Sequence, residues 1–349
     1  MAMGKEPIKS SKKPICSICI ANYNGIDVIE SAIESVYAQD CDFEFEIIIH
    51  DDASTDRSVE FIRKNYPDVC LIVSKRNVGF CISNNRMVAK AHGDNILLLN
   101  NDAALFPDAL SSLYRQSMKE EKPAILGLPQ YNERTGELID RGSLLDPFAN
   151  PVPNLIRKRS QVAMVIGACM WFPKTLWEEL GGFLDFFGSL AEDLYLCCYA
   201  RLRGNPVKMI STSGFKHRVG GSLGGGKVIN RRLSTRKTRR AFSERNKSFV
   251  IVLTYPSPYF QLIFPLHIIL LGLEGILLAL IKNDVSLWQS IYLACIKSIW
   301  QNRRMLYDLR KRVQKSRGIS SRKFFSSFCW MHHKLRMLMK YGIPEIKMI

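Results

Sequence analysis

Apolar residues in the first hundred positions form four short, continuous runs, a pattern typical of strands that are covered on both faces. These runs lie at residues 15–21, 45–49, 70–74 and 96–99. Between the runs we expect helices, at residues 27–38, 56–65 and 83–91. Ser54 or Thr55 is expected to cap the second helix. Strands and helices that alternate with short links predict a parallel, doubly wound α/β sheet.

Polar residues follow three of these strands at the point where each strand ends. They are Asn22-Tyr23-Asn24, Asp51-Asp52 and Asn100-Asn101-Asp102. In a sheet of this class, ligands bind beyond the carboxyl ends of the strands. Neither of the usual glycine-rich phosphate loops, G-x-G-x-x-G or G-x-x-x-x-G-K-[ST], follows the first strand. If the sheet holds a nucleotide, we therefore expect carboxylates and a metal to hold it.

The pattern becomes more mixed between residues 124 and 172. The apolar run at 167–172, which contains Trp171, is expected to be a strand that faces an acceptor pocket. Glu192 and Asp193 then begin a predicted helix. Residues 220–226, GGSLGGG, are expected to form a flexible loop, and residues 227–247 are strongly basic.

Residues 260–281 form the longest apolar segment, and 22 residues are enough to cross a bilayer. The segment also contains Pro265, His267 and Glu274, and charges at membrane depth are costly. Basic stretches lie on both sides of it. We therefore expect an amphipathic or re-entrant hairpin on an anionic leaflet rather than a simple span. The alternative is a buried helix of a soluble C-terminal bundle.

Charge is distributed unevenly along the 349 residues. Residues 1–200 carry 20 Lys+Arg and 27 Asp+Glu, a net charge of −7, whereas residues 201–349 carry 29 and 5, a net charge of +24. This asymmetry predicts a mildly acidic body and a basic tail that seeks a polyanion, either nucleic acid or an anionic membrane surface. No helix-turn-helix, zinc or aromatic RNA-binding signature supports nucleic acid, so we expect none as a partner.

The ten cysteines are expected to be reduced core residues of a cytosolic protein. Most of them lie in apolar runs, among them Cys19, Cys70, Cys169 and Cys295, and the basic N-terminus is followed by no apolar leader. Cys16 and Cys19 have C-x-x-C spacing, but positions i and i+3 of a strand point to opposite faces. A metal or redox role for this pair is therefore not expected.

Several motifs in fixed order resemble the family 2 glycosyltransferases. They are ANYNG, HDDASTD, RNVGF and NND after successive strands, followed by GGFLDFFGSLAEDL, GFKHRVGGS and SERN. The resemblance covers about residues 15–250. HRVGGS, SERN and the apolar, basic tail further resemble the rhamnosyltransferase-type enzymes of bacterial polysaccharide assembly. The family implies a GT-A fold, a nucleotide-diphosphate sugar donor, inversion at the anomeric carbon, and Mg²⁺ or Mn²⁺ as cofactor.

The resemblance assigns the metal to Asp102 and His217. Asp102 matches the last acid of a D-x-D-type motif, in which Asn100 and Asn101 replace the usual first residues, and Asn101 would contact the donor. His217 would close over the metal and the diphosphate, because a neutral imidazole can ligate a metal and a charged one can pair with phosphate. The alternatives are that Asp102 only caps a helix and that His217 is structural.

The donor base would be bound by the first two motifs. Asp52 matches the acid that accepts a hydrogen bond from the base, and Tyr23 would lie beside the base with Ala21. Asn77 and Gly79 match a loop that lines the donor pocket. Asp51 is an alternative to Asp52, and both acids are also compatible with a simple turn.

The acceptor hydroxyl would lose its proton to Asp193, the predicted general base, while Glu192 orients the site. Both acids also suit the first turn of a helix, where the dipole favours them. Tyr195 stands where related enzymes often have a further acid. Trp171, Arg218 and Arg245 are expected to contact the acceptor or a diphosphate. Basic residues on a solvated face are the alternative for the two arginines.

The resulting prediction is an inverting glycosyltransferase at the cytoplasmic face of the inner membrane. Its donor would be a dTDP- or UDP-linked sugar, with rhamnose as the candidate, and its acceptor a glycan or a polyprenyl-diphosphate-linked glycan. The expected organisation is a basic tail (1–14), a GT-A domain (15–250, with halves 15–120 and 121–250) and a helical, membrane-associating region (251–349). A degenerate protein that binds sugar nucleotide without turnover is the alternative.

Overall fold

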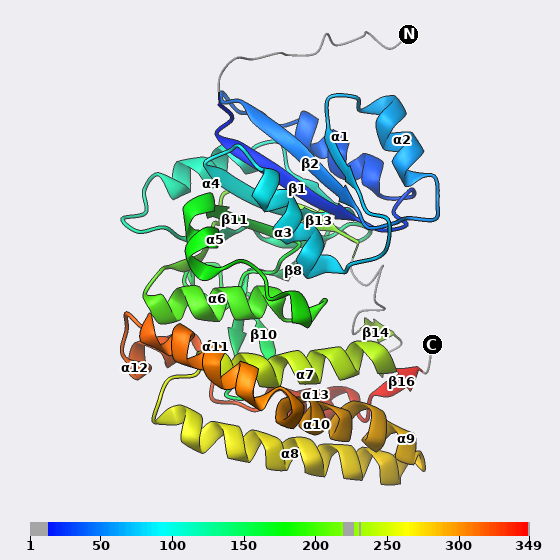
Figure 1. The fold of residues 1–349 in the computed structure, drawn as a ribbon, viewed down its shortest axis with the longest axis vertical. Helices are drawn as coiled ribbons and strands as arrows, with labels where there is room; N and C mark the ends of the chain where they lie inside the picture. The colour runs from blue at the N-terminus through cyan, green and yellow to red at the C-terminus, as the bar shows by residue number, and fades with distance from the viewer. Residues whose placement is uncertain (1–12, 219–226, 230–231, 348–349) are drawn as a thin grey trace.

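A mixed sheet of seven strands, in the order β12-β6-β11-β4-β1-β2-β3, lies at the centre of the fold (Figure 1). The computed structural model describes residues 13–218, 227–229 and 232–347. The strands of this sheet are β1 (Cys16–Asn22), β2 (Phe45–Asp51), β3 (Cys70–Val73), β4 (Asn95–Asn100), β6 (Ile125–Gly127), β11 (Cys169–Pro173) and β12 (Val207–Met209). β4, β1, β2 and β3 are parallel, whereas β11 runs antiparallel to β4 and β6. The four predicted strands are confirmed.

Helices cover both faces of this sheet because its strands alternate between two cores. The helices are α1 (Ile29–Tyr37), α2 (Ser58–Asn65), α3 (Phe80–Lys90), α4 (Ala109–Ser117), α5 (Lys174–Leu180) and α6 (Glu192–Arg203), with a short turn η1 (Asp185–Phe187) before α6. Leu97 and Leu99 pack with α1, α2 and α4, whereas Ile96 and Leu98 pack with α3, α5 and α6. The predicted doubly wound α/β class is therefore confirmed.

The predicted cap of the second helix is wrong. α2 begins at Ser58 after Arg57, and no side chain caps it. Ser54 instead donates its hydroxyl to Asp51 and accepts a hydrogen bond from the amide of Asn24. The polar turn is therefore used to join two strand ends rather than to start the helix.

A smaller four-stranded sheet lies beside the carboxyl end of β4, in the order β5-β13-β7-β8. Its strands are β5 (Ala103–Leu105), β7 (Gln130–Asn132), β8 (Leu138–Asp140) and β13 (Phe215–His217). β13 pairs antiparallel with β5 and parallel with β7, which puts His217 opposite Ala103 and Asn132. This pairing brings residue 217 next to residue 102, more than a hundred positions earlier in the chain.

Further helices form a layer beyond α6 (Figure 1). They are α7 (Lys237–Thr254), α8 (Tyr259–Lys282), α9 (Val285–Leu287), the π-helical turn η2 (Trp288–Leu293), α10 (Ala294–Gln301), α11 (Arg303–Lys315), α12 (Ser321–Phe324), η3 (Phe325–Ser327) and α13 (His333–Tyr341). Residues 249–253 of α7 belong to the same core as α6 and the sheet. Residue 250, where we predict the end of the GT-A domain, thus lies inside a helix.

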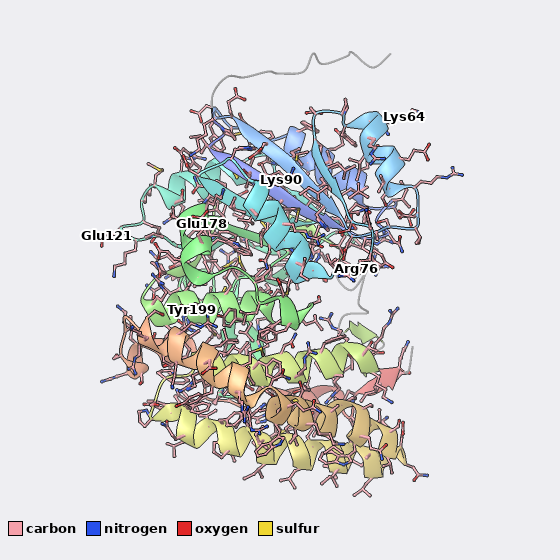
Figure 2. The ribbon with its side chains drawn as sticks, viewed as in Figure 1. Lys64, Arg76, Lys90, Glu121, Glu178 and Tyr199 are labelled. Carbon is pink, nitrogen blue, oxygen red and sulfur yellow. The ribbon has the colours of Figure 1, made fainter. Side chains whose placement is uncertain are left out.

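α8 is one continuous helix, so the expected re-entrant hairpin is not what the structure contains. By length and composition it is the one helix among the described residues that could cross a membrane, and 33% of its apolar window is buried in the protein. Its polar residues face inward: His267 contacts Ser248, and Glu274 contacts Arg240 and Lys334. The opposite face is exposed and apolar, with Leu262, Leu266, Ile269, Leu273, Ile276, Leu277, Leu280 and Ile281. Figure 2 shows the side chains of α8 (yellow) extending outward at the bottom of the view, away from the other helices.

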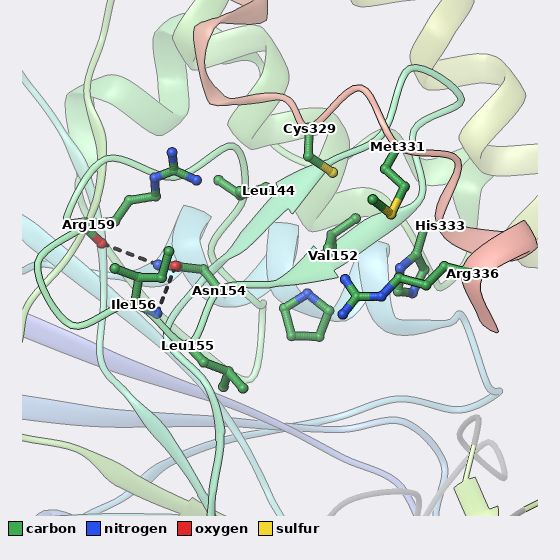
Figure 3. Close-up of a pocket in the computed structure, with 11 residues that line it drawn as sticks. Leu144, Val152, Asn154, Leu155, Ile156, Arg159, Cys329, Met331, His333 and Arg336 are labelled. Atoms are coloured by element: carbon green, nitrogen blue, oxygen red, sulfur yellow. Dashed lines mark hydrogen bonds between the residues drawn. The ribbon is translucent and has the colours of Figure 1, made fainter. Parts of the chain in front are cut away.

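Three short pairings complete the fold. The hairpin of β9 (Ser143–Leu145) and β10 (Pro151–Pro153) packs against residues 328–336, with a cavity of about 240 Å³ between them (Figure 3). No residue of the predicted site lines this cavity. β14 (Lys227–Ile229), β15 (Arg232–Arg236) and β16 (Glu345–Lys347) form a separate sheet, so the C-terminal strand lies beside the start of α7. The predicted loop at 220–226 lies outside the described residues.

All ten cysteines are free thiols in the structure, as expected. Seven of them are buried, and burial raises the pKa of the thiol in Cys19 and Cys169. Cys70, however, is exposed, because β3 is the edge strand of the sheet. The expectation of a core position is therefore wrong for Cys70.

Candidate active site

A relay of polar side chains links the carboxyl ends of β1, β2 and β4. The Asn101 amide donates to Asn22 Oδ1 (2.9 Å), and the Asn22 amide donates to Asp51 Oδ2 (2.8 Å). Asp51 also accepts hydrogen bonds from the amide and hydroxyl of Ser54. A Cβ atom on Gly25 would lie 2.2 Å from Asn22 Oδ1, so any other residue there would displace this relay. Asp51 thus fixes the relative positions of the strand ends. The predicted contact of Asn101 with the donor would be made by a side chain whose amide already donates to Asn22.

Asp52 holds the loop before α3. Its two carboxylate oxygens accept hydrogen bonds from the amides of Val78 (2.7 Å) and Gly79 (2.8 Å). Gly79 has a φ of 89°, which favours glycine, and it lies against Gly188 of the loop before α6. Each carboxylate oxygen retains a second lone pair. The role of Asp52 toward a base remains a prediction, but its contacts already bring Gly79 to the strand ends.

The remaining residues predicted to contact the donor differ in exposure. Tyr23 follows β1 and is 50% exposed, so its ring is available to stack on a base. Asn77 is exposed in the loop that Asp52 holds, and Ala21 is half-buried in β1 beside His50 and Asn100. All three lie on the side of the sheet where the strands end.

Asp102 and His217 are in direct contact, as the pairing of β5 with β13 requires. Nε2 of His217 lies 3.0 Å from Oδ1 of Asp102. The Gln130 amide nitrogen lies 2.8 Å from Nδ1 of the same ring, a contact that holds the imidazole in this orientation. Asn100 is close as well, with Nδ2 3.5 Å from Nε2. Gln130 is absent from the sequence-based prediction, because nothing in the local sequence marks it.

This pair fits one part of the coordination shell of a divalent cation. A carboxylate oxygen and an imidazole nitrogen are suitable ligands for Mn²⁺, and Mg²⁺ commonly takes one carboxylate together with substrate phosphates and water. Among the described residues, no group of three or more His, Cys, Asp and Glu side chains could hold a metal ion. The rest of the shell would therefore have to come from the ligand. Arg218 is exposed next to this pair, and its amide donates to the Asp102 carbonyl.

Glu192 and Asp193 lie at the start of α6 and are both buried. Asp193 Oδ2 accepts a hydrogen bond from the amide of Gly167 (2.9 Å), whereas Oε2 of Glu192 has no hydrogen-bond partner. Burial, and then the charge of Asp193, raise the pKa of Glu192 to about 8. Burial also raises the pKa of Asp193, although backbone hydrogen bonds partly oppose the shift. Arg239, on the first turn of α7, lies close enough to lower both pKa values.

A short connection joins the acid pair to the metal pair. The amide of Asn100 donates to the carbonyl of Ala168 (3.0 Å), and the amide of the preceding residue, Gly167, donates to Asp193. Residues 167–168 thus lie between the end of β4, which leads into Asp102, and the start of α6. The structure therefore brings together the two clusters that we predicted separately.

The backbone before the acid pair is held in an unusual conformation. Leu190 and Ala191 have φ values of 74° and 63°, which non-glycine residues rarely adopt. The buried Asn246 amide nitrogen lies within 3.0 Å of the carbonyl oxygens of Phe187, Ser189 and Leu190. Such strain persists only where surrounding contacts impose it, and it is concentrated at functional sites. The SERN motif pointed to this segment, but the sequence did not reveal what Asn246 holds.

Arg245 and Trp171 occupy structural positions. The Arg245 guanidinium donates to the carbonyls of Phe186 and Phe187 and lies over the Phe242 ring, so it supports the same loop. The contact of Arg245 with a diphosphate remains a prediction. Trp171 is fully buried between β4 and β6, where an acceptor cannot reach its ring. The prediction that Trp171 contacts the acceptor is therefore wrong, and this side chain belongs to the core.

The order of the strands and the helices on both faces of the sheet place the fold in the GT-A class. A solved structure of Staphylococcus aureus TarS 1-349 with UDP resembles the chain at a TM-score of 0.51 and 18% identity, covering 71% of this chain and 69% of that one. A structure of GalNAc-T7 with UDP, GalNAc and Mn²⁺ gives a TM-score of 0.56 at 16% identity, covering 72% of this chain and 49% of that one. At these identities the likeness establishes the fold.

The family follows from the sequence comparisons. Residues 17–181 match the family model described as glycosyl transferase family 2, so the chain carries a domain of this family. It is 29% identical to chondroitin synthase of Pasteurella multocida (strain Pm70) over 237 residues, which are 61% of this chain and 24% of that protein. It is 30% identical to hyaluronan synthase of Pasteurella multocida over 198 residues, which are 54% of this chain and 19% of that protein. The chain thus spans a quarter or less of these relatives.

Proposed function

We propose that the chain is an inverting glycosyltransferase that moves a sugar from a nucleotide-diphosphate donor to a glycan in polysaccharide synthesis. The observation that carries this proposal is the connection through residues 167–168, which sets the Asp102–His217 pair beside the Glu192–Asp193 pair. The family 2 domain, and relatives named chondroitin synthase, hyaluronan synthase and poly(ribitol-phosphate) beta-glucosyltransferase (Bacillus spizizenii), support it. UDP in the TarS and GalNAc-T7 structures supports a UDP-linked donor.

In this mechanism the acceptor hydroxyl attacks the anomeric carbon from the face opposite the diphosphate. Asp193 takes the hydroxyl proton as the new carbon–oxygen bond forms and the bond to the diphosphate breaks. Protonated Glu192 can donate a hydrogen bond to the acceptor. Asp102 and His217 would hold Mg²⁺ or Mn²⁺, which neutralises charge that develops on the leaving diphosphate. Arg218 would contact the same diphosphate, because a guanidinium pairs well with phosphate oxygens.

The test is a screen of UDP- and dTDP-linked sugars, rhamnose among them, for binding and hydrolysis with Mn²⁺ or Mg²⁺. We expect Asp102→Asn to weaken metal-dependent donor binding, and Asp193→Asn to retain binding but lower turnover by at least about 100-fold. Asp94→Asn, at an exposed ion pair with Lys13, is the matched control and should behave as wild type. Binding without turnover in the wild-type chain would favour the degenerate alternative. Absence of binding to every donor would contradict the proposal.

We also propose that the chain works at the cytoplasmic face of a membrane, on a lipid-linked acceptor. The support is the exposed apolar face of α8 together with the net charge of +24 in residues 201–349. Because Glu274 points into the protein and the exposed face of α8 is apolar, the helix suits a position in the interfacial plane. Sedimentation with membranes should be sensitive to detergent and unaffected by nuclease. Release by nuclease would instead indicate nucleic acid as the polyanion.

A further inference from the structure

A basic pocket lies at the turn that joins α7 to α8, on the side of α11. Its volume is about 340 Å³, and it is lined by Ser257, Tyr307, Arg310, Lys311, Gln314 and Arg317. Positions 307, 310, 311 and 314 follow the spacing of three or four residues that puts side chains on one face of a helix, here α11. Figure 1 shows α11 (orange) near the connection that joins α7 to α8.

The cations of the pocket are held in place by neutral groups. Arg310 donates to the Val252 carbonyl, and its guanidinium lies 3.8 Å above the Phe260 ring of α8. Arg317 donates to the Ile319 carbonyl (2.6 Å), and the Lys311 ammonium lies 4.4 Å from the centre of the Tyr307 ring. These contacts orient three positive charges toward one cavity without neutralising any of them.

No carboxylate among the described residues forms an ion pair with these three cations. Asp308 is the only acid in α11, and it is exposed. Burial lowers the pKa of Arg310 to about 10, as expected for a guanidinium that has lost water without gaining an anion. Arg310 is half-buried and Lys311 and Arg317 are exposed beside it, and three neighbouring cations repel one another less when an anion lies among them.

The surroundings of the pocket indicate where this anion comes from. Arg310 stacks on the second residue of α8, and the exposed face of that helix begins with Leu262. Trp300, near the end of α10, and Tyr307, in α11, are both exposed. The Arg303 guanidinium lies over the Trp300 ring. Aromatic and basic residues next to an exposed apolar helix are typical of proteins at a membrane interface. The anions at such an interface are the phosphates of the lipid headgroups.

The geometry assigns this pocket as a binding site for the phosphate of an anionic membrane lipid, with Arg310, Lys311 and Arg317 as its ligands. The acyl chains of that lipid would lie along the exposed face of α8. The assignment rests on the proposed membrane location and adds the lipid contact that orients α8. A guanidinium and an ammonium at one phosphate make charge-assisted hydrogen bonds, which are stronger than attraction to a diffuse surface charge.

The test is flotation of the full chain with phosphatidylcholine vesicles, with or without phosphatidylglycerol. The pocket variant is Arg310→Gln with Lys311→Gln. The matched control is Arg304→Gln with Lys315→Gln, which removes the same charge from exposed positions of α11 that do not line the pocket. We expect the pocket variant to lose at least about tenfold more affinity for the anionic vesicles than the control. Glycerol 3-phosphate should compete with vesicles for the wild-type chain and not for the pocket variant.

Equal losses in the two variants, or equal binding to neutral and anionic vesicles, would overturn the assignment. If inorganic phosphate stabilises the wild-type chain against heat while the pocket variant keeps full vesicle binding, the pocket takes a free anion instead. Lys311→Gln with Arg317→Gln leaves Arg310 packed on Phe260 and replaces the first variant if that does not fold. The assay needs no sugar donor, so failure of the transferase proposal is detected separately, by the donor screen.

Discussion

The two adjacent acids at the start of α6 share one buried environment, which favours a different protonation state for each of them. Ionising either group raises the pKa of the other, since two like charges are unfavourable in a site that excludes water. With its pKa raised to about 8, Glu192 is mainly protonated at neutral pH. Two backbone amides donate to Asp193, so Asp193 carries the negative charge of the pair. This division is consistent with the proposed roles of Asp193 as the base and Glu192 as a hydrogen-bond donor.

The rate of transfer should depend on pH through the protonation of both Asp193 and Glu192. We expect kcat/KM to fall at low pH, where Asp193 is protonated, and to fall again above about pH 8, where Glu192 loses its proton. Glu192→Gln mimics the neutral acid, so it should retain activity near pH 7 and lose the basic limb. The measurement is kcat/KM from pH 5 to 9.5 for both proteins. An unchanged basic limb in Glu192→Gln would show that another group causes it.

At the scale of elements, α7 positions the start of α6. Asn246 is fully buried, and its amide contacts three carbonyls of the loop that carries Leu190 and Ala191 in left-handed conformations. The loop also contacts α3, because the amide of Cys81 donates to the carbonyl of Gly188. α7 therefore connects the helical layer to the acid pair and, through Gly188, to the loop predicted to bind the donor.

Removal of the Asn246 amide should slow catalysis more than it weakens donor binding. Asn246→Ala leaves buried carbonyls without a donor, which costs about 2 kcal/mol of unfolding free energy. The displaced acid pair should lower kcat by at least about tenfold, with donor affinity within about twofold of wild type. Asn302→Ala removes a comparable amide, which donates to the Ser298 carbonyl far from the acid pair, and serves as the control for stability alone. Equal kcat values in the two variants would contradict a positioning role.

At the scale of the whole molecule, a buried polar network joins the helical layer together. Glu244 of α7 and Glu274 of α8 form ion pairs with Lys334 of α13, and Arg240 of α7 pairs with Glu274. Lys334 and Arg240 lower the pKa of both carboxyl groups against the effect of burial, and Lys247 also lowers that of Glu244. His267 of α8 lies in the same network and contacts the Ser248 hydroxyl (2.8 Å). The network keeps charged residues of the most apolar helix away from its exposed face.

The stability of the protein should therefore fall in mild acid. Burial lowers the pKa of His267 to about 4 in the folded protein, so the unfolded chain binds more protons between pH 6.5 and 4, and unfolding becomes easier as pH falls through this range. Between pH 6.5 and 5 this one group accounts for about 2 kcal/mol. Glu244 and Glu274, with lowered pKa values, add to the loss below about pH 4.5.

His267→Gln isolates this contribution. Urea unfolding at pH 6.5 and pH 5 should give a smaller stability difference for His267→Gln than for the wild-type chain. Burial also lowers the pKa of His50 and His333, so a part of the pH dependence should remain in the variant. The same pH dependence in both proteins would mean that His267 is not the group that titrates.

Much of the element order could be predicted from the sequence because the signals are local. The four strands of the parallel part and the helices between them follow from short apolar runs and helical spacing, and the structure has them within a few residues of the predicted ends. Asp102 could be noticed because an acid ends an apolar strand, whereas Asp193 could be selected through the resemblance to the family 2 glycosyltransferases. Trp171, by contrast, looks the same in sequence whether its strand is central or lines a pocket, and only the position of β11 between β4 and β6 decides.

By itself, the sequence determined the α/β class, the strand-end acids, the basic C-terminal third and the apolar segment that became α8. Tertiary structure alone decided which distant residues meet: Gln130 with His217, Asn246 with the loop at 187–190, and Arg310 with Phe260. The physical reason is that periodicity and charge report the neighbours of a residue along the chain. Strand pairing and helix packing set its neighbours in space, and these determine which carboxylate is a base and which cations lack an anion.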